Sequence, residues 1–445
     1  MPLRDLLLFG VFAVFIPMAL VHPYIGAIMW VVFGLMNPHR LTFGPAYNFP
    51  FAMIIALTTF AGIMLTRDEK QVKGGWPAVV LIVFAVWMTF TTLHALTPEA
   101  AWPMWSRVMK IFVMTFVLLL LLHTKRHIDL VMAAMLFSIG FYGVKGGVFT
   151  ILTGGQGTVW GPEDSMIQTN NALGVANVMI IPFLVHYYQQ TSNRWARAGL
   201  VMVLLLCAAS ILGSYSRGAV LALGAMCAVL WARSSYKALI FAVVMAIGVA
   251  MIPFMPERWM ERMHTIQTYE TESSAMSRIY AWKTAWNIAV DRLDGGGFEY
   301  PTKQVMAKYS PGPYISVAHS IYFQALGEHG FIGLGMFLLF WCLVWRECAR
   351  IRVRARDRPG LQWAFSLMSM TQASLAGYAV GGAFLNLAFW DMPYYLYAAT
   401  VVTEYVVNGA LASATPDEAS PARVAVGNLS GALSRTATRQ TASST

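Results

Sequence analysis

Residues 197–233, RAGLVMVLLLCAASILGSYSRGAVLALGAMCAVLWAR, contain two apolar runs that are separated only by the short stretch from Ser214 to Gly218. A helix that crosses a bilayer needs about 20 mostly apolar residues. Because the backbone in lipid must satisfy its own hydrogen bonds, long apolar runs predict helices. This stretch therefore predicts two membrane-spanning helices joined by a tight turn, and the same pattern recurs along the chain.

The composition extends this prediction to the whole chain. Of 445 residues, 57% are hydrophobic and 12% are charged, about half the charged fraction of an average soluble domain. The sequence predicts an all-α polytopic membrane protein of about 12 transmembrane helices. Its apolar runs lie near 5–36, 50–65, 77–95, 108–122, 129–151, 171–188, 197–213, 217–231, 239–255, 320–345, 362–384 and 392–410.

The run 5–36 is too long for one straight helix and is interrupted at Pro17 and at His22-Pro23. It could form two spans, or two short pieces that cross once. Loops rich in Lys and Arg are typically cytoplasmic. With one crossing, every short basic loop and both chain ends lie in the cytoplasm. With two crossings, the basic loops stay in the cytoplasm only if Arg4 and the N-terminus lie outside. One net crossing is therefore expected. The basic loops carry Arg67/Lys70/Lys73, Lys125/Arg126, Arg194/Arg197, Arg233/Lys237 and Arg346–Arg358.

This topology divides the chain into four regions. We expect nine crossings over 1–255 (with 5–36 counted as one broken span), an external loop over 256–318, further transmembrane helices over 319–410 and a disordered cytoplasmic tail over 411–445. The net charge is +10, and because its basic residues lie in cytoplasmic loops it does not indicate a nucleic-acid partner. The four cysteines form no CxxC pair and are expected to be small buried residues.

Arg217 lies in the turn Ser214-Tyr215-Ser216-Arg217-Gly218, at the outer edge of the membrane and at the start of a helix. A helix N-terminus attracts anions, and a guanidinium can bind phosphate oxygens with two parallel hydrogen bonds. The alternative is an arginine that reaches out to lipid headgroups. The residues alone leave both interpretations open.

Arg278 lies in the external loop, in a segment that Ser273 or Ser274 can cap as a helix. At 100° per residue, Arg278, Trp282 and Trp286 form one stripe. We expect an amphipathic helix on the membrane surface that ends at Gly295-Gly296-Gly297. The tryptophans favour a packing role over a role as sugar platforms.

His319 is at the outer end of the run 320–345. A histidine there is either a hydrogen-bonded interfacial residue or a catalyst. Glu328 follows nine residues later, on the opposite face and about 13 Å along the axis, so it is not expected to orient His319. Lys145, flanked by glycines in the outer third of its span, is a second-rank anion ligand. Asp391, in the last external turn, is given no role.

The sequence carries no P-loop, GxSxG or HExxH motif, and no DxD motif in an external loop. Metal-dependent transfer needs clustered carboxylates or histidines. We therefore expect no metal and no cofactor, and any group transfer is expected to rely on arginines.

Over about residues 50–400 the chain resembles the O-antigen ligases (WaaL-type) and the wider O-antigen polymerase/ligase superfamily. The resemblance rests on Ser216-Arg217-Gly218, on Ser277-Arg278 with its tryptophans and glycines, and on His319-Ser320-Ile321-Tyr322 through Glu328-His329-Gly330-Phe331-Ile332-Gly333. The opening stretch, with Asn37-Pro38-His39-Arg40-Leu41-Thr42, is similar to O-glycosylation ligases associated with the exosortase system.

The resemblance implies a glycosyltransferase with a GT-C-like helical fold in the inner membrane of a Gram-negative bacterium, with its active site facing the periplasm. The donor would be an undecaprenyl-pyrophosphate-linked glycan and the acceptor the lipid A-core oligosaccharide. His319 would act as the catalytic base, and Arg217, Arg278 and Lys145 would bind pyrophosphate. The alternatives are an O-antigen polymerase or protein O-glycosylation ligase and, from another class, a transporter of lipid-linked sugars.

Overall fold

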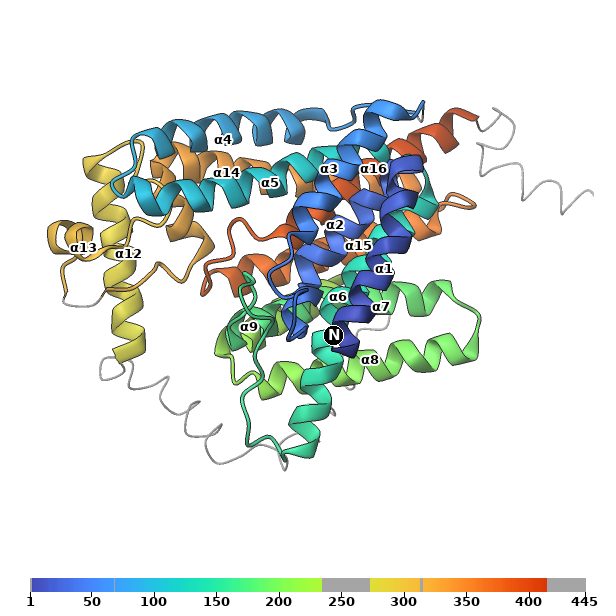
Figure 1. Cartoon of the computed structure of the whole chain (residues 1–445), viewed down its shortest axis with the longest axis horizontal. Helices are drawn as coiled ribbons and strands as arrows, with labels where there is room; N and C mark the ends of the chain where they lie inside the picture. Colours follow the sequence, from blue (N-terminus) through green and yellow to red (C-terminus); the bar gives the residue numbers. More distant parts are fainter. Residues whose placement is uncertain (1, 68, 234–272, 313–314, 414–445) are drawn as a thin grey trace, which may run out of the picture.

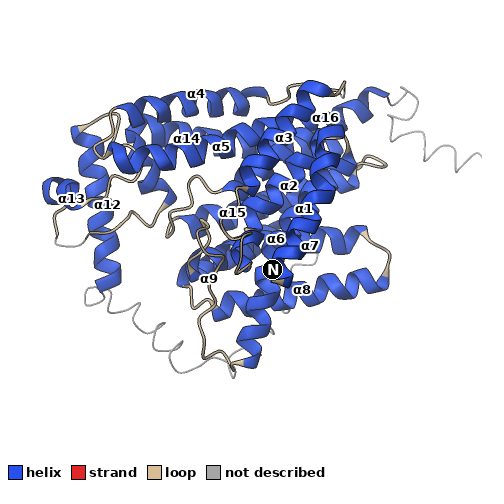
Figure 2. Cartoon of the chain, in the orientation of Figure 1, coloured by secondary structure: helices blue, strands red, loops and turns tan. Residues whose placement is uncertain are grey.

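A computed structural model describes residues 2–67, 69–233, 273–312 and 315–413 of the chain. This part is helical and contains no strand (Figure 2). Seven of its helices are long and apolar enough to cross a membrane, which makes the chain a polytopic membrane protein. The span predicted at 239–255 and the tail beyond 413 lie outside the described residues.

The elements run in the order α1 (Leu3–Val21), α2 (Pro23–Met36), η1 (Pro38–Leu41), α3 (Phe51–Leu65), α4 (Gly75–Leu93), α5 (Pro98–Leu121), α6 (Lys125–Leu152), α7 (Asn170–Gln190), α8 (Arg194–Gly213), α9 (Arg217–Arg233), α12 (Ser273–Asp291), α13 (Lys303–Tyr309), α14 (Ile321–Ala355), α15 (Gln362–Gly382) and α16 (Asp391–Ser413).

The first two helices form an antiparallel hairpin (Figure 1). Arg4 Nη1 donates to the Leu41 carbonyl at 3.0 Å, and the Ala46 N–H donates to Asp5 Oδ1 at 2.9 Å, so the start of α1 lies beside the segment that follows α2. A single broken crossing over 5–36 does not fit this hairpin. Pro23 occupies the first position of α2, where a proline is tolerated, and the chain reverses at His22. The two-crossing alternative, with Arg4 at the end opposite the basic loops, fits the packing.

The basic loops gather at one end of the bundle, as the charge pattern predicts. Lys73 Nζ donates to the Leu122 carbonyl at 3.1 Å, which joins the α3–α4 and α5–α6 connections. Arg233 Nη1 and Arg352 Nε donate to the carbonyl and to the hydroxyl of Ser369, at 3.4 and 2.9 Å. We call this the basic-loop end, and the opposite end, with the α8–α9 turn, the Arg217 end.

Glycines allow α6 and α8 to pack closely. A methyl group on Gly147 would lie 2.1 Å from the Leu206 carbonyl oxygen, and one on Gly143 would lie 2.4 Å from Cys207 Sγ. Only glycine fits at such an approach. The glycines that flank Lys145 therefore serve helix packing, and the group that approaches them is α8.

Helix α14 is broken at Gly330, whose φ of 67° and ψ of −170° are not helical. The carbonyls released by the break find other donors. The N–H groups of Gly296 and Gly297 donate to the Gly327 and Glu328 carbonyls, both at 2.8 Å, and Trp87 Nε1 donates to the His329 carbonyl at 2.9 Å. A buried carbonyl without a partner is costly, so these three bonds hold the break in place.

Candidate active site at the Arg217 end

The α8–α9 turn has the compact geometry that the sequence predicts. Helix α8 ends at Gly213 and α9 begins at Arg217, with Tyr215 at a φ of 53° between them. Ser216 Oγ accepts the Ala219 N–H at 3.1 Å and thereby caps α9. Asn170 Nδ2 donates to the Ser214 carbonyl at 2.7 Å, which ties the turn to the start of α7. Arg217 is thus fixed in the first turn of its helix.

Helix α12 is the amphipathic helix predicted around Arg278, and it lies across the ends of α4 and α14 (Figure 1). Trp282 stacks on Phe323 with ring centroids 5.0 Å apart, and its indole N–H donates to the Ala318 carbonyl at 2.7 Å. Trp282 is therefore a packing residue, as expected. Its hydrogen bond fixes the position of Ala318, the residue immediately before His319.

Arg278 and His319 face the same small region. Arg278 lies one helical turn before Trp282 on the α12 stripe. Burial lowers the pKa of His319, and the positive charge of Arg278 lowers that pKa further. Because such an influence requires proximity, the structure brings together these two residues that the sequence singles out.

His319 has a left-handed backbone conformation, with a φ of 43°. A positive φ is uncommon outside glycine, although asparagine, aspartate and histidine adopt it more often than other residues, and such conformations concentrate at functional sites.

The end of α15 connects the Arg217 turn to His319. A methyl group on Gly218 would lie 3.4 Å from Phe384 Cβ, and one on Gly382 would lie 2.7 Å from Ile321 Cδ1. Residues 382–384 thus touch both the residue after Arg217 and the start of α14, two residues after His319. Arg217 and His319 are thus each within two residues of this junction.

Lys145 is exposed on α6. Its neighbour Gly146 packs against Ser210 and Val159, and the Val159 N–H donates to the Gly213 carbonyl at 3.0 Å. These contacts place the Lys145 backbone beside the end of α8.

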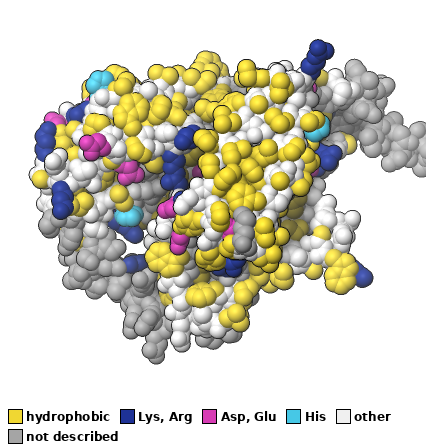
Figure 3. Space-filling model, in the orientation of Figure 1, with side chains coloured by type: hydrophobic (Ala, Val, Ile, Leu, Met, Phe, Trp, Pro, Cys, Tyr) yellow, Lys and Arg dark blue, Asp and Glu magenta, His cyan; other side chains and the backbone are white. Residues whose placement is uncertain are grey.

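Two further arginines lie at this end, and the sequence analysis assigned neither of them to the site. Arg40 Nη2 forms an ion pair with Asp164 Oδ2 at 3.0 Å. Arg107 Nη2 donates to the Asp164 carbonyl at 3.0 Å, and its charge counteracts the burial that raises the pKa of Glu299. In Figure 3, charged side chains border the hollow between α12 and the N-terminal helices. The sequence signal that could have identified Arg107 as a candidate site residue is its position at the outer end of the apolar run 108–122.

Glu328 and His329 are buried behind the junction. Glu328 Oε1 accepts from Gln324 Nε2 at 3.5 Å, and His329 Nδ1 is 2.7 Å from Thr91 Oγ1. Glu328 therefore faces its own helix and the 295–300 loop, in keeping with the prediction that it does not orient His319. Asp391, which was given no role, accepts from the Tyr395 hydroxyl at 3.0 Å.

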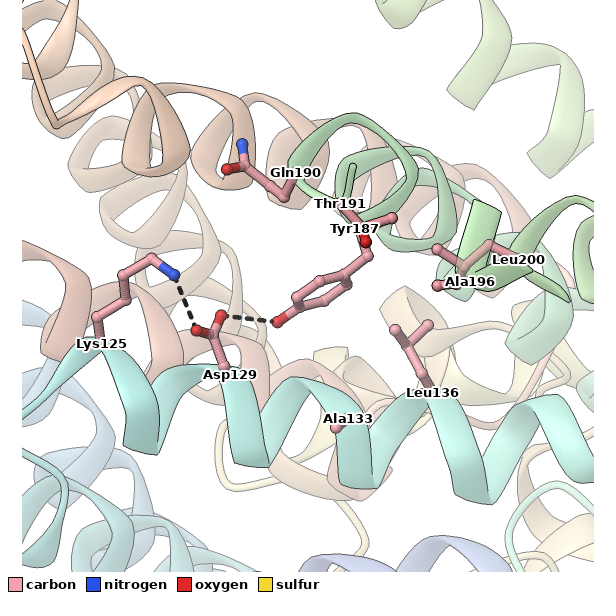
Figure 4. Close-up of a pocket in the computed structure, with 9 residues that line it drawn as sticks. All are labelled: Lys125, Asp129, Ala133, Leu136, Tyr187, Gln190, Thr191, Ala196 and Leu200. Carbon is pink, nitrogen blue, oxygen red and sulfur yellow. Dashed lines mark hydrogen bonds and ion pairs between the residues drawn. The ribbon is translucent and has the colours of Figure 1, made fainter. Parts of the chain in front are cut away.

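A pocket at the basic-loop end contains an ion pair (Figure 4). It measures about 550 Å³ and lies between α6, α7 and α8. Lys125 Nζ lies 2.9 Å from Asp129 Oδ2, and the Tyr187 hydroxyl donates to Asp129 Oδ1 at 3.1 Å. Its charged groups satisfy one another, so we assign no chemistry to it. The described residues contain no group of three or more His, Cys, Asp or Glu side chains placed to hold a metal.

Two regions of the chain match known protein families. Residues 3–193 match a family of unknown function (DUF5935), and residues 200–338 match the O-antigen ligase family. The second match contains Arg217, Arg278 and His319. No curated protein matches the chain. Residues 200–338 are therefore similar to a family of glycosyltransferases that act on lipid-linked glycans, and residues 3–193 are similar to a family whose function is not known.

Proposed function

We propose that this protein transfers a glycan from undecaprenyl pyrophosphate to a hydroxyl of the lipid A-core oligosaccharide, at the periplasmic face of the inner membrane. One observation carries the proposal. The segment that matches the O-antigen ligases contains both Arg278 and His319, and the charge of Arg278 acts on His319 at the junction that also borders the Arg217 turn.

The chemistry follows from these side chains. The acceptor hydroxyl attacks the anomeric carbon of the donor, and His319 takes its proton. A neutral imidazole is suited to this task near neutral pH. The bond between the anomeric carbon and the pyrophosphate oxygen breaks, and negative charge grows on the leaving group. Arg217 and Arg278 stabilise that charge, with Lys145 as a more distant cation. A single displacement of this kind inverts the anomeric centre and uses no metal.

The N-terminal region bears on the acceptor. Its opening stretch is similar to O-glycosylation ligases associated with the exosortase system, so a protein hydroxyl is a competing acceptor. The end of a growing glycan is the acceptor for a polymerase of the same superfamily. A transporter of lipid-linked sugars is the less favoured function, because the candidate residues gather at one end of the bundle, whereas a transporter places its site near the midplane.

Reconstitution distinguishes these functions. Purified protein in liposomes is given undecaprenyl-pyrophosphate-linked glycan with either lipid A-core or an acceptor protein, in the presence of EDTA. We expect transfer to lipid A-core and full activity in EDTA. Transfer to the acceptor protein alone would show that the acceptor is a protein and not lipid A-core. Absence of transfer to either acceptor would refute the ligase proposal. Loss of activity in EDTA would contradict the metal-free mechanism.

A further inference from the structure

An apolar groove of about 500 Å³ lies between α14 and α15. Phe337, Leu338, Trp341 and Cys342 form one wall on the second limb of α14. Leu375, Ala376 and Ala379 of α15 form the other wall, and Ile321 and Tyr322 of the first limb close one end. Arg346 lies on the same face of α14, towards the basic-loop end.

The break at Gly330 creates this groove. The Tyr322 hydroxyl donates to the Ala379 carbonyl at 2.9 Å, and the Trp341 ring lies 5.6 Å from the Tyr378 ring. Both limbs of α14 therefore reach the same short stretch of α15, although 19 positions separate Tyr322 from Trp341 in the sequence. A continuous helix would carry these residues about 28 Å apart. The three hydrogen bonds that hold the break thus also hold the groove open.

One end of the groove lies beside the candidate site. Ile321 follows His319 by two residues and packs on Gly382, at the junction that the Arg217 turn also borders. A ligand whose anionic end lies at that junction can therefore continue directly into the groove.

The walls determine which ligand fits. They are almost entirely aliphatic and aromatic, and the Tyr322 hydroxyl already donates to a carbonyl. Such a surface favours a long hydrocarbon chain with no polar groups. We propose that the groove holds the isoprenoid chain of the lipid-linked donor, over the units nearest the pyrophosphate. This proposal rests on the proposed function, because it assigns the chain to the molecule whose pyrophosphate lies at Arg217 and Arg278.

Cys342 provides a direct test of occupancy. It is exposed, while Cys207 and Cys348 are buried. The rate at which a maleimide modifies Cys342 is measured in detergent micelles with undecaprenyl pyrophosphate or with phosphatidylglycerol, and Cys342→Ala gives the background. We expect undecaprenyl pyrophosphate to slow modification at least fivefold and phosphatidylglycerol to leave it unchanged. Equal rates with and without undecaprenyl pyrophosphate, or equal protection by the phospholipid, would overturn the proposal.

This measurement needs no glycan transfer, so its outcome is separate from that of the proposed function. Protection of Cys342 without transfer to any acceptor would support the lipid site and refute the ligase proposal. Transfer without protection of Cys342 would support the ligase proposal and refute the groove as the binding site of the isoprenoid chain.

A matched pair of variants tests the groove in the transfer assay. Leu338 lines the groove, whereas its neighbour Leu339, which is similarly exposed at 49% against 42%, is not among the lining residues. Leu338→Trp is expected to raise KM for the donor about tenfold with kcat retained, because it fills the groove, and Leu339→Trp is expected to change neither. Ala376→Phe fills the groove from α15 and replaces Leu338→Trp if that variant does not fold. Equal effects of groove and control variants would refute the assignment.

Discussion

The two ends of the bundle both carry arginines, but their backbones differ. Within the described residues, the non-glycine residues with a positive φ are Asn37, Asp164, Tyr215, Glu299, His319 and Asp357. All except Asp357 lie at the Arg217 end. A positive φ is uncommon outside glycine and persists where the surroundings impose it, so the irregular backbone distinguishes the candidate site where charge alone does not.

The cations at the basic-loop end have structural partners. Arg354 Nη1 lies 3.2 Å from Glu404 Oε1 and 3.0 Å from Asn408 Oδ1, and Arg350 Nη1 lies 3.0 Å from Glu347 Oε2. An exposed pair such as Arg354–Glu404 contributes about 0–1 kcal/mol. The main role of these basic residues is to orient the chain in the membrane. The comparison predicts that substitutions at the Arg217 end affect transfer, whereas those at the basic-loop end leave it nearly unchanged.

The largest expected effect is that of His319→Asn. Asparagine tolerates the left-handed conformation of this position, so the variant removes the base without adding backbone strain. We expect transfer to fall between about 10²- and 10⁴-fold with unchanged thermal stability. The measurement is the initial rate in liposomes beside a melting curve of the same preparation. Near-normal transfer would remove His319 as the base.

Arg278→Gln should reduce transfer by about 10²-fold and also alter its pH dependence. His319 acts as a base only when neutral, so activity falls as the pH drops through its pKa. Burial and Arg278 hold that pKa below its ordinary value. Without the arginine the pKa rises, and the acid limb of kcat/KM moves to higher pH. A fixed acid limb would mean that Arg278 does not act on the catalytic base.

Gly330→Ala tests the break in α14 through stability. A methyl group there would lie 1.9 Å from the Leu293 carbonyl oxygen, at a φ of 67°. The backbone conformation alone should cost about 1–3 kcal/mol, so the melting midpoint in detergent should fall. Gly335→Ala is the control, because no neighbour lies within 4 Å of its added methyl and alanine stabilises a helix interior by about 1 kcal/mol. Equal midpoints for the two variants would contradict the account of the break.

Arg40→Gln should have the smallest effect. Arg40 lies at the Arg217 end, but it pairs with a largely exposed Asp164. We expect a stability change of about 0–1 kcal/mol and transfer within about twofold of the original. A loss comparable to that of Arg278→Gln would place Arg40 among the substrate ligands and would extend the site into the N-terminal region.

Local patterns in the sequence predicted the local structure well. The polytopic helical class, the α8–α9 turn and the helix that begins at Ser273 depend on apolar runs, a five-residue interruption and a helical stripe. Each of these signals lies within one short segment. The common end of the basic loops follows from a rule that sums charge over short loops.

Features that depend on long-range pairing could not be predicted. The α1–α2 reversal depends on contacts of Arg4 and Asp5 with residues 41 and 46. Gly330 lies inside the run 320–345 that was predicted as one helix, and the partners of its break, the Gly295–Gly297 loop and Trp87, are distant in the sequence. The Arg40–Asp164 pair joins residues 124 positions apart. None of these partners is adjacent in the sequence.

The central claim is tested most directly by comparing Arg217→Lys with Arg354→Lys in the same liposome transfer assay. Lysine keeps the charge but loses the planar fork that binds phosphate oxygens. The account predicts a loss of about 10²-fold or more for Arg217→Lys, and transfer within twofold of the original for Arg354→Lys at an exposed pair. Retention of transfer by Arg217→Lys, or an equal loss in both variants, would contradict the assignment of the active site to the Arg217 end.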